Sequence, residues 1–162
     1  MEIVWFMTLN VGMNSRLGGL VTRLEKGNVD VIFLQELNLN TENLNLLVAR
    51  YGYKAEASFD ENFTHKPGIG MVWKLNLPME SVVEIVEGRA QRAKLGPYFL
   101  LNVYAPSGSD KMMKRKRFFA EDIFRAIRVN MNEGWIFGGD FNAILSILDV
   151  EDGVGFPAKK KP

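Results

Sequence analysis

Hydrophobic residues along the chain form two patterns, short continuous apolar runs and stripes at helical spacing. Residues 3–9 and 29–34 are continuous runs, which are typical of strands covered on both faces. Between them, a stripe at helical spacing ends at a Gly-Asn pair: Leu17, Leu20, Val21 and Leu24, then Gly27-Asn28. The first part of the chain therefore predicts a strand, a helix and a second strand.

The middle of the chain predicts a shorter helix and several strands. Asn40 or Thr41 can cap a helix that carries Leu44, Leu47 and Val48. Proline and glycine signals then separate four predicted strands: Gly70–Lys74, Val82–Val86, Ala90–Leu95 and Tyr98–Tyr104. Gly96-Pro97 is the clearest turn, and it predicts a hairpin.

A second long helix and one more strand complete the pattern. The helix is marked by apolar residues at helical spacing: Phe119, Ile123, Phe124, Ile127 and Met131. Of these, we expect Phe119, Ile123 and Ile127 to form a core stripe. A basic run, Lys111–Arg117, precedes it, and the apolar segment 135–137 follows. Strands mixed with helices predict an α/β fold in which helices pack on sheets. We expect one domain over residues 1–152 and a flexible Lys-rich tail over 153–162.

Composition excludes several classes of protein. The chain has 162 residues, 47% of them hydrophobic and 24% charged, with a net charge of +1, as in ordinary globular domains. No cysteine is present, which excludes disulfides, thiolate metal sites and a cysteine nucleophile. We see no signal peptide and no apolar run long enough to cross a bilayer, so we expect no membrane partner and an intracellular location.

Polar residues end several of the apolar strands. They are Asn10, Glu36, Tyr104 and Asp140, the last within the segment Gly138–Asn142 (GGDFN). Side chains alternate along a strand, so we expect Asp140 and Asn142 to project to one side while Phe141 faces the core. A single polar residue at a strand end is usually a cap or a turn. If these strand ends converge, however, their oxygen atoms suit Mg²⁺ or Mn²⁺, which could act on a phosphate.

Four ordered motifs carry a resemblance to a known family: Thr8–Val11, Leu34–Glu36, Asn102–Pro106 and Gly138–Asn142. The chain resembles the endonuclease/exonuclease/phosphatase superfamily and, within it, the apurinic-like endonuclease domain of LINE-type retrotransposons. Two further segments agree with that branch, Gly68–Met71 and Leu145–Asp149. The resemblance implies a DNase I-like fold, a two-sheet α/β sandwich with flanking helices.

The resemblance also implies a role for each candidate residue in cleaving DNA. Glu36 would be the principal ligand of Mg²⁺ or Mn²⁺, with Asn10 beside it. Asp140 would position or deprotonate the attacking water, and Asn142 would orient the scissile phosphate. Tyr104 would donate a hydrogen bond to that phosphate as charge develops on it. In this branch the product is a nick in target DNA that primes reverse transcription, which implies a nuclear location.

Basic residues before the second long helix are candidates for contacts with the DNA backbone. Lys114, Arg115 and Arg117 could neutralise phosphates, although a solvated first helical turn explains them equally well. His65 lies in a polar stretch with no partner at ligand spacing, which favours a solvated loop.

The chain departs from the family near its end and in its first motif. The family has a late Asp and a Ser-Asp-His motif, whereas nothing after Asp149 matches, and His65 is the only histidine. The loop after Asn10 is also one residue shorter than usual. We therefore expect an incomplete domain that lacks its last strands and has weak or no activity.

Three explanations of the incomplete pattern stay open: a truncated piece, a retained descendant of a retroelement, or strands supplied by another chain. The alternative function is a catalytically silent DNA-binding or interaction module with the nuclease fold. A phosphatase of inositol phosphates or a sphingomyelinase is disfavoured by the motif after GDFN. An unpaired sheet edge could also support a homodimer or strand exchange.

Overall fold

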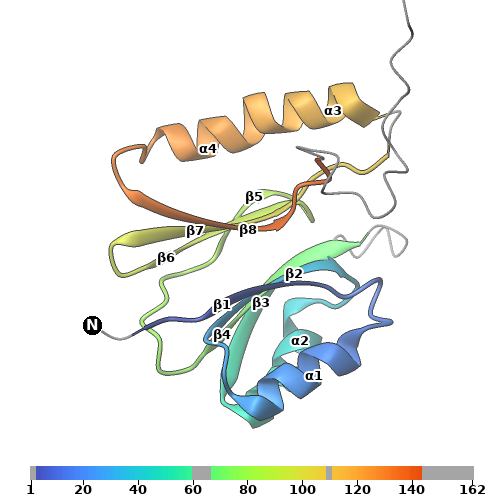
Figure 1. Ribbon diagram of the computed structural model, residues 1–162, viewed down its shortest axis with the longest axis vertical. Helices are drawn as coiled ribbons and strands as arrows, with labels where there is room; N and C mark the ends of the chain where they lie inside the picture. Colours follow the sequence, from blue (N-terminus) through green and yellow to red (C-terminus); the bar gives the residue numbers. More distant parts are fainter. Residues whose placement is uncertain (1–2, 60–66, 109–110, 144–162) are drawn as a thin grey trace, which may run out of the picture.

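Two four-stranded sheets pack face to face, and helices cover both outer faces (Figure 1). The computed structural model describes residues 3–59, 67–108 and 111–143. In Figure 1 the layers run from α1 and α2, through the sheet of β1 to β4 and the sheet of β5 to β8, to α3 and α4. This is the two-sheet α/β sandwich with flanking helices that the sequence predicts.

The first sheet has the strand order β1-β2-β4-β3. Its strands are β1 (Phe6–Asn10), β2 (Val31–Leu37), β3 (Tyr53–Ser58) and β4 (Gly68–Lys74). β1 and β2 are parallel, joined by α1 (Leu17–Lys26), while β4 is antiparallel to both of its neighbours. α2 (Thr41–Val48) and a 3₁₀ turn (Ala49–Tyr51) lead into β3.

The second sheet has the order β5-β6-β7-β8. Its strands are β5 (Val83–Val86), β6 (Ala90–Leu95), β7 (Tyr98–Tyr104) and β8 (Gly134–Asp140). β7 and β8 are parallel, and one long helix connects them. That helix consists of α3 (Met112–Arg117), a π-helical turn (Phe118–Ile123) and α4 (Phe124–Arg128).

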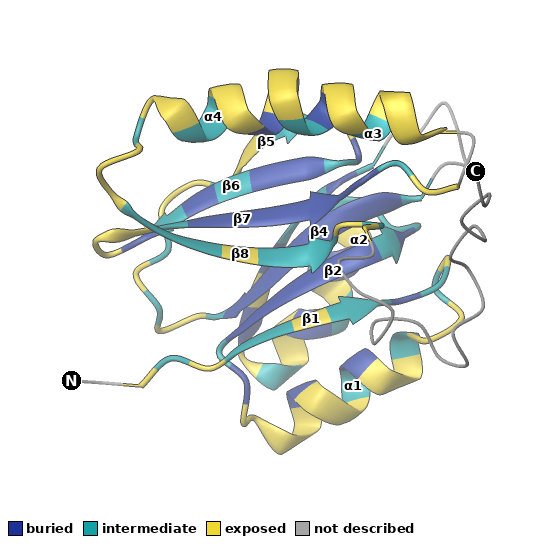
Figure 2. Ribbon diagram, turned by 45° about the horizontal axis from the view of Figure 1, so that its top comes forward, coloured by how far each residue is buried: buried dark blue, intermediate teal, exposed yellow. Residues whose placement is uncertain are grey.

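The apolar residues form three layers of core. Along β2 the side chains alternate: Val31 and Phe33 pack between the sheets, while Ile32 and Leu34 face α1 and α2. A third cluster, which includes Ile123, lies between the second sheet and the long helix. Figure 2 shows that burial is deepest on the inner strands β2, β4 and β7. β2 is therefore covered on both faces, as its continuous apolar run predicts.

Several predicted elements are confirmed with small changes of boundary. Gly27 ends α1 in the left-handed conformation, and the Asn40 side chain caps α2 by accepting the N–H of Asn43. The predicted strands Ala90–Leu95 and Tyr98–Tyr104 have the observed bounds and form a hairpin around Gly96. Ile123 belongs to the core, with Phe119 and Ile127 packed against it, as expected, whereas Phe124 and Met131 are exposed.

Three predictions about elements are wrong. The first apolar run is not buried on both faces: Ile3 and Trp5, which precede β1, are 73% and 63% exposed. Among the described strands, β1 is an edge strand of its sheet and pairs with β2. The basic run does not precede the long helix but lies in its first turns, within Met112–Arg117. β3 was not predicted, because its sequence, YKAEAS, has no run of large apolar residues. No helix among the described residues is long and apolar enough to cross a membrane.

A buried hydrogen-bond network joins the two sheets. Gln35 of β2 and Asn102 of β7 are 1% and 0% exposed, and Gln35 Nε2 donates to Asn102 Oδ1 at 2.9 Å. Asn102 Nδ2 donates to the carbonyls of Leu34 at 3.1 Å and Gly70 at 2.9 Å, both in the first sheet. Thr8 completes the network by donating to Gln35 Oε1 at 3.0 Å. The network fixes β7 against β2 directly below their polar ends.

We predict that Asn102→Ala destabilises the fold by about 2–4 kcal/mol, because it leaves buried groups of Gln35, Leu34 and Gly70 without partners. Gln91→Leu is the matched control: Gln91 is equally buried, but its Oε1 has no partner among the described residues. Urea unfolding measures both variants. Equal losses of stability in the two would contradict this role of Asn102.

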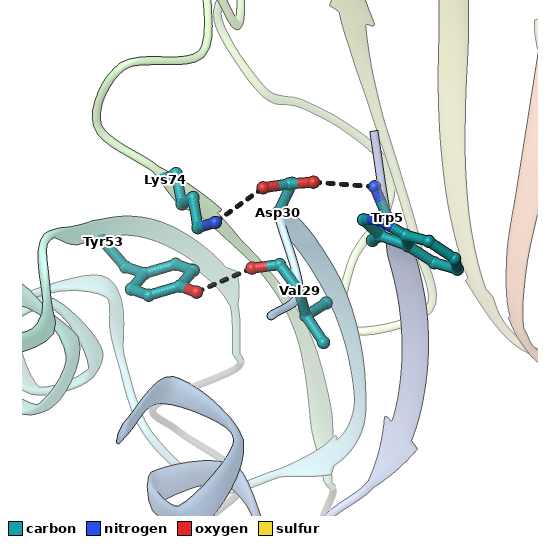
Figure 3. A network of polar contacts seen from close by, with 5 residues as sticks. All are labelled: Trp5, Val29, Asp30, Tyr53 and Lys74. Atoms are coloured by element: carbon teal, nitrogen blue, oxygen red, sulfur yellow. Dashed lines mark hydrogen bonds and ion pairs between the residues drawn. The ribbon is translucent and has the colours of Figure 1, made fainter. Parts of the chain in front are cut away.

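A second network holds the opposite end of the first sheet (Figure 3). Asp30 accepts the backbone N–H of Trp5 at 2.7 Å and pairs with the Lys74 ammonium at 2.8 Å. The Tyr53 hydroxyl donates to the carbonyl of Val29 at 2.6 Å. Burial by itself would raise the pKa of Asp30, but the hydrogen bonds from Lys74 and Trp5 and the charge of Lys74 outweigh it and lower the pKa.

This lowered pKa predicts acid sensitivity. Asp30 stabilises the fold above its unfolded pKa, near 3.8, and this contribution is lost as the pH falls through the lower folded pKa. We expect Asp30→Asn to lose about 1–3 kcal/mol of unfolding free energy at pH 7. The difference in unfolding free energy between the wild-type protein and Asp30→Asn, measured with urea, should become smaller below pH 3.8. A gap that widens toward acid would contradict the assignment.

Candidate active site at the strand ends

The carboxyl ends of four strands meet at one edge of the sandwich. Tyr104 and Asp140 are register partners in the parallel pair β7–β8, and Asn10 is the partner of Gln35 in the parallel pair β1–β2. A cavity of about 470 Å³ is lined by both groups: Thr8, Asn10, Gln35, Gly139, Asp140, Phe141, Asn142 and Ala143. Three predicted residues therefore line one cavity: Asn10 from the first sheet, and Asp140 and Asn142 from the second.

A β-bulge aims Glu36 at this site. Leu34 and Leu37 both belong to the core under α1 and α2, although they are three residues apart, so the alternation of β2 is broken between them. The register of β2 on β4 shifts there, and Glu36 has a φ of 54°. A regular strand would point Glu36 into the helix-facing core. Instead, its Oε1 accepts a hydrogen bond from the Tyr104 hydroxyl across 3.4 Å.

Tyr104 is the buried group of the site, with 5% of its surface exposed. Burial raises the pKa of its phenol above 10.0, and the charges of Glu36 and Asp140 raise it further, whereas Arg89 lowers it. The phenol therefore stays protonated at physiological pH and can donate a hydrogen bond. Asp140 is the register partner of Tyr104 in β8, and Glu36 accepts the Tyr104 hydroxyl, so an acid from each sheet lies beside this residue.

Asn142 and Asp140 fix the loop that ends β8. Asp140 Oδ1 accepts the Asn142 N–H at 3.0 Å, and Asn142 Nδ2 donates to the carbonyl of Ala105 at 2.7 Å. The predicted strand alternation is wrong here, because Asn142 has a φ of 47° and the chain turns. Phe141 does not face the core either: it is 37% exposed and stacks on Phe119, with 6.3 Å between ring centroids. The turn, rather than the pleat, presents the carboxylate and the amide together.

Each glycine of the same segment is required by a close approach. A Cβ on Gly138 would collide with the ring of Phe33 in the opposite sheet. Gly139 has a φ of 136°, and a Cβ there would collide with the backbone of Val103 in β7. The glycines therefore let β8 pack tightly enough to bring Asp140 beside Tyr104.

Asn10 orders the short loop after β1. Its Oδ1 accepts the N–H of Gly12 at 2.9 Å, which leaves the second lone pair of this oxygen for a ligand. Farther along the loop, Asn14 and Asn38 exchange two hydrogen bonds, of 2.8 and 2.9 Å. These contacts hold the loop next to the site, although the loop is one residue shorter than the family pattern.

The donor set fits a hard divalent cation. Within residues 3–59, 67–108 and 111–143, no three His, Cys, Asp or Glu residues gather around one point. Asp140 and Asn10 nonetheless line an open cavity with space for water, and the Glu36 carboxylate lies beside Tyr104 at the same strand ends. Mg²⁺ typically keeps several waters and takes only one or two carboxylates, so this small set matches its chemistry.

The predicted DNA-backbone residues differ in their surroundings. Arg115 Nη1 donates to the carbonyls of Pro106 at 2.9 Å and Gly108 at 3.2 Å, so it tethers the loop after β7. Arg117 lies 3.7 Å from Glu121, and Lys114 is exposed. Unlike Arg117, Lys114 has no ion pair among the described residues. His65, the segment Leu145–Asp149 and the predicted tail over 153–162 lie outside the described residues.

Sequence reasoning missed Gln35, Asn102 and Arg89. Gln35 carried a signal, because it is a polar residue within the apolar run of β2. Asn102 carried the same signal in β7. Arg89 carried none, since its position beside Tyr104 depends on the pairing of β6 with β7.

An α/β sandwich whose strand ends gather two acids, two amides and a phenol defines a class of phosphoester-cleaving proteins. The family model for the endonuclease/exonuclease/phosphatase family matches residues 7–156, and the chain belongs to this family. No curated protein matches the chain. The LINE-type branch is a finer assignment than this match provides.

Solved structures share the fold. An AP endonuclease from Archaeoglobus fulgidus superposes with a TM-score of 0.75 at 18% identity, over 93% of this chain and 62% of its own. A 3′ phosphatase from Neisseria, bound to a product DNA hairpin, superposes with a TM-score of 0.70 at 20% identity, over 86% of this chain and 58% of its own. Humanized D. rerio TDP2 superposes with a TM-score of 0.63 at 19% identity, over 96% of this chain and 68% of its own. The chain thus spans about three fifths of the length of the first two.

The strained backbone of Glu36 gives a testable prediction. Glycine adopts a positive φ without the steric penalty of a Cβ, so we expect Glu36→Gly to be more stable than Glu36→Ala by about 1 kcal/mol. Chemical denaturation compares the two variants, neither of which has the carboxylate. A more stable alanine variant would show that the bulge does not hold this backbone conformation in solution.

Proposed function

We propose that the chain is the nuclease domain, or part of it, of a metal-dependent enzyme that hydrolyses phosphodiester bonds in DNA. The observation that carries the proposal is the Tyr104 phenol. It is buried, its hydroxyl donates to Glu36 of the first sheet, and its register partner in β8 is Asp140; burial and both acids raise its pKa. A neutral donor beside two acids is suited to a substrate whose transition state gathers negative charge.

The surroundings of each residue suggest a separate role in the reaction. Asp140, held by the Asn142 N–H, would position or deprotonate the attacking water. The second N–H of the Asn142 amide has no hydrogen-bond partner among the described residues and would orient the scissile phosphate. The Tyr104 hydroxyl would turn from Glu36 to a phosphate oxygen, since its present hydrogen bond is long, at 3.4 Å.

Glu36 and Asn10 would hold Mg²⁺ or Mn²⁺. Such an ion supplies neutralisation of phosphate charge and a lowered pKa for bound water. The bulge at Glu36 supports this role, because it directs a carboxylate away from an apolar core toward the open edge.

DNA is the proposed substrate, and a LINE-type retrotransposon is the proposed source of the domain. The family motifs support this, as do similar structures described as an AP endonuclease and as a phosphatase bound to a DNA hairpin. Exposed Lys114 near the loop after β7 would contact the DNA backbone. Nicking of target DNA would place the protein in the nucleus.

Plasmid nicking tests the proposal. We expect relaxation of supercoiled DNA with Mg²⁺ or Mn²⁺ and none with EDTA. Glu36→Gln and Asp140→Asn keep shape while removing charge, and each should lower the rate at least about 100-fold. Glu42→Gln, an exposed acid in the first turn of α2, is the matched control and should be unaffected.

The outcomes separate the two candidate functions. Nicking that survives both site substitutions would come from a contaminant and would refute the assignment. Absence of nicking together with salt-dependent binding of DNA would favour the silent binding module instead.

A further inference from the structure

Arg89 lies against Tyr104, the last residue of β7. Arg89 is the residue before β6, and its guanidinium carbon is 4.5 Å from the centroid of the Tyr104 ring. The backbone fixes this pairing, because the Tyr104 N–H donates to the Arg89 carbonyl at 2.8 Å. Arg89 Nη1 also reaches the Tyr104 carbonyl, at 3.5 Å. The side chain is thus attached to the residue whose ring it covers.

The contact joins a planar cation to the face of a phenol. A guanidinium is charged at every accessible pH, and its flat shape matches a ring face better than an ammonium does. Stacking restricts rotation of the ring about its own side-chain bonds. The edge of the ring, which bears the hydroxyl, is thereby held toward Glu36.

We infer that Arg89 is a positioning residue for Tyr104: its guanidinium fixes the ring and directs the hydroxyl toward Glu36 at the strand ends. The consequence for catalysis rests on the proposed nuclease function, whereas the coupling between the two side chains does not. Arg89 itself need not touch the substrate.

Arg92 provides a matched control within the same hairpin. Its guanidinium lies over the ring of Phe99, at 5.5 Å from the centroid, so it makes the same kind of contact with a ring that has no hydroxyl. Like Arg89, it is partly buried. A general effect of losing an arginine from this sheet should appear in both variants.

Ring motion tests the coupling directly. The chain has four tyrosines, and ¹³Cε labelling with a Tyr104→Phe reference identifies the signals of Tyr104. We expect Arg89→Gln to raise the flip rate of the Tyr104 ring, Arg89→Lys to restore part of the change, and Arg92→Gln to leave the rate unaltered. An unchanged flip rate in Arg89→Gln, or equal changes in the Arg89 and Arg92 variants, would overturn the inference.

Kinetics test the consequence. Arg89→Gln should lower kcat about tenfold with little change in KM, because the ring loses its alignment. In the Tyr104→Phe background the same substitution should have almost no further effect, and equal losses in both backgrounds would refute a role through Tyr104. If the chain nicks no DNA, the proposed function fails, while the flip rate of the Tyr104 ring still decides whether Arg89 holds that ring.

Discussion

The hydrogen bond between Gln35 and Asn102 is the constraint on which the rest of the structure depends. It crosses from one sheet to the other in a fully buried position, and Asn102 satisfies two further carbonyls of the first sheet. Buried amides tolerate only a register that pairs all their groups. Since Glu36 follows Gln35 and Tyr104 lies two residues after Asn102, this register also sets the distance between acid and phenol.

The site combines this rigid base with local backbone strain. Glu36 and Asn142 both have positive φ values, and each lies where a strand would otherwise continue. The bulge turns Glu36 outward, and the turn at Asn142 brings its amide beside Asp140. Such departures are tolerated where function requires a side chain that regular geometry would misdirect. The glycines before Asp140 serve the same end by permitting close packing of β8.

The sequence predicted the fold class and most strands because long apolar runs and helical stripes are local signals. It failed for β3, whose residues after Tyr53 are small or charged, and for the exposure of β1, because edge position depends on which strands pair. The site residues could be named from strand ends and motifs. The bulge at Glu36, the turn at Asn142 and the approach of Arg89 depend on contacts between distant segments, which no local pattern reveals.

The central claim is that four strand ends form one cation-binding and phosphate-binding pocket. Paramagnetic relaxation by Mn²⁺ on ¹⁵N-labelled protein tests it most directly, since broadening falls steeply with distance from the ion. The account predicts that the side-chain amides of Asn10 and Asn142 and the backbone N–H of Glu36 broaden first, at low Mn²⁺ concentration. Early broadening around Asp30 at the opposite end of the sheet, with the strand-end signals unaffected, would contradict it.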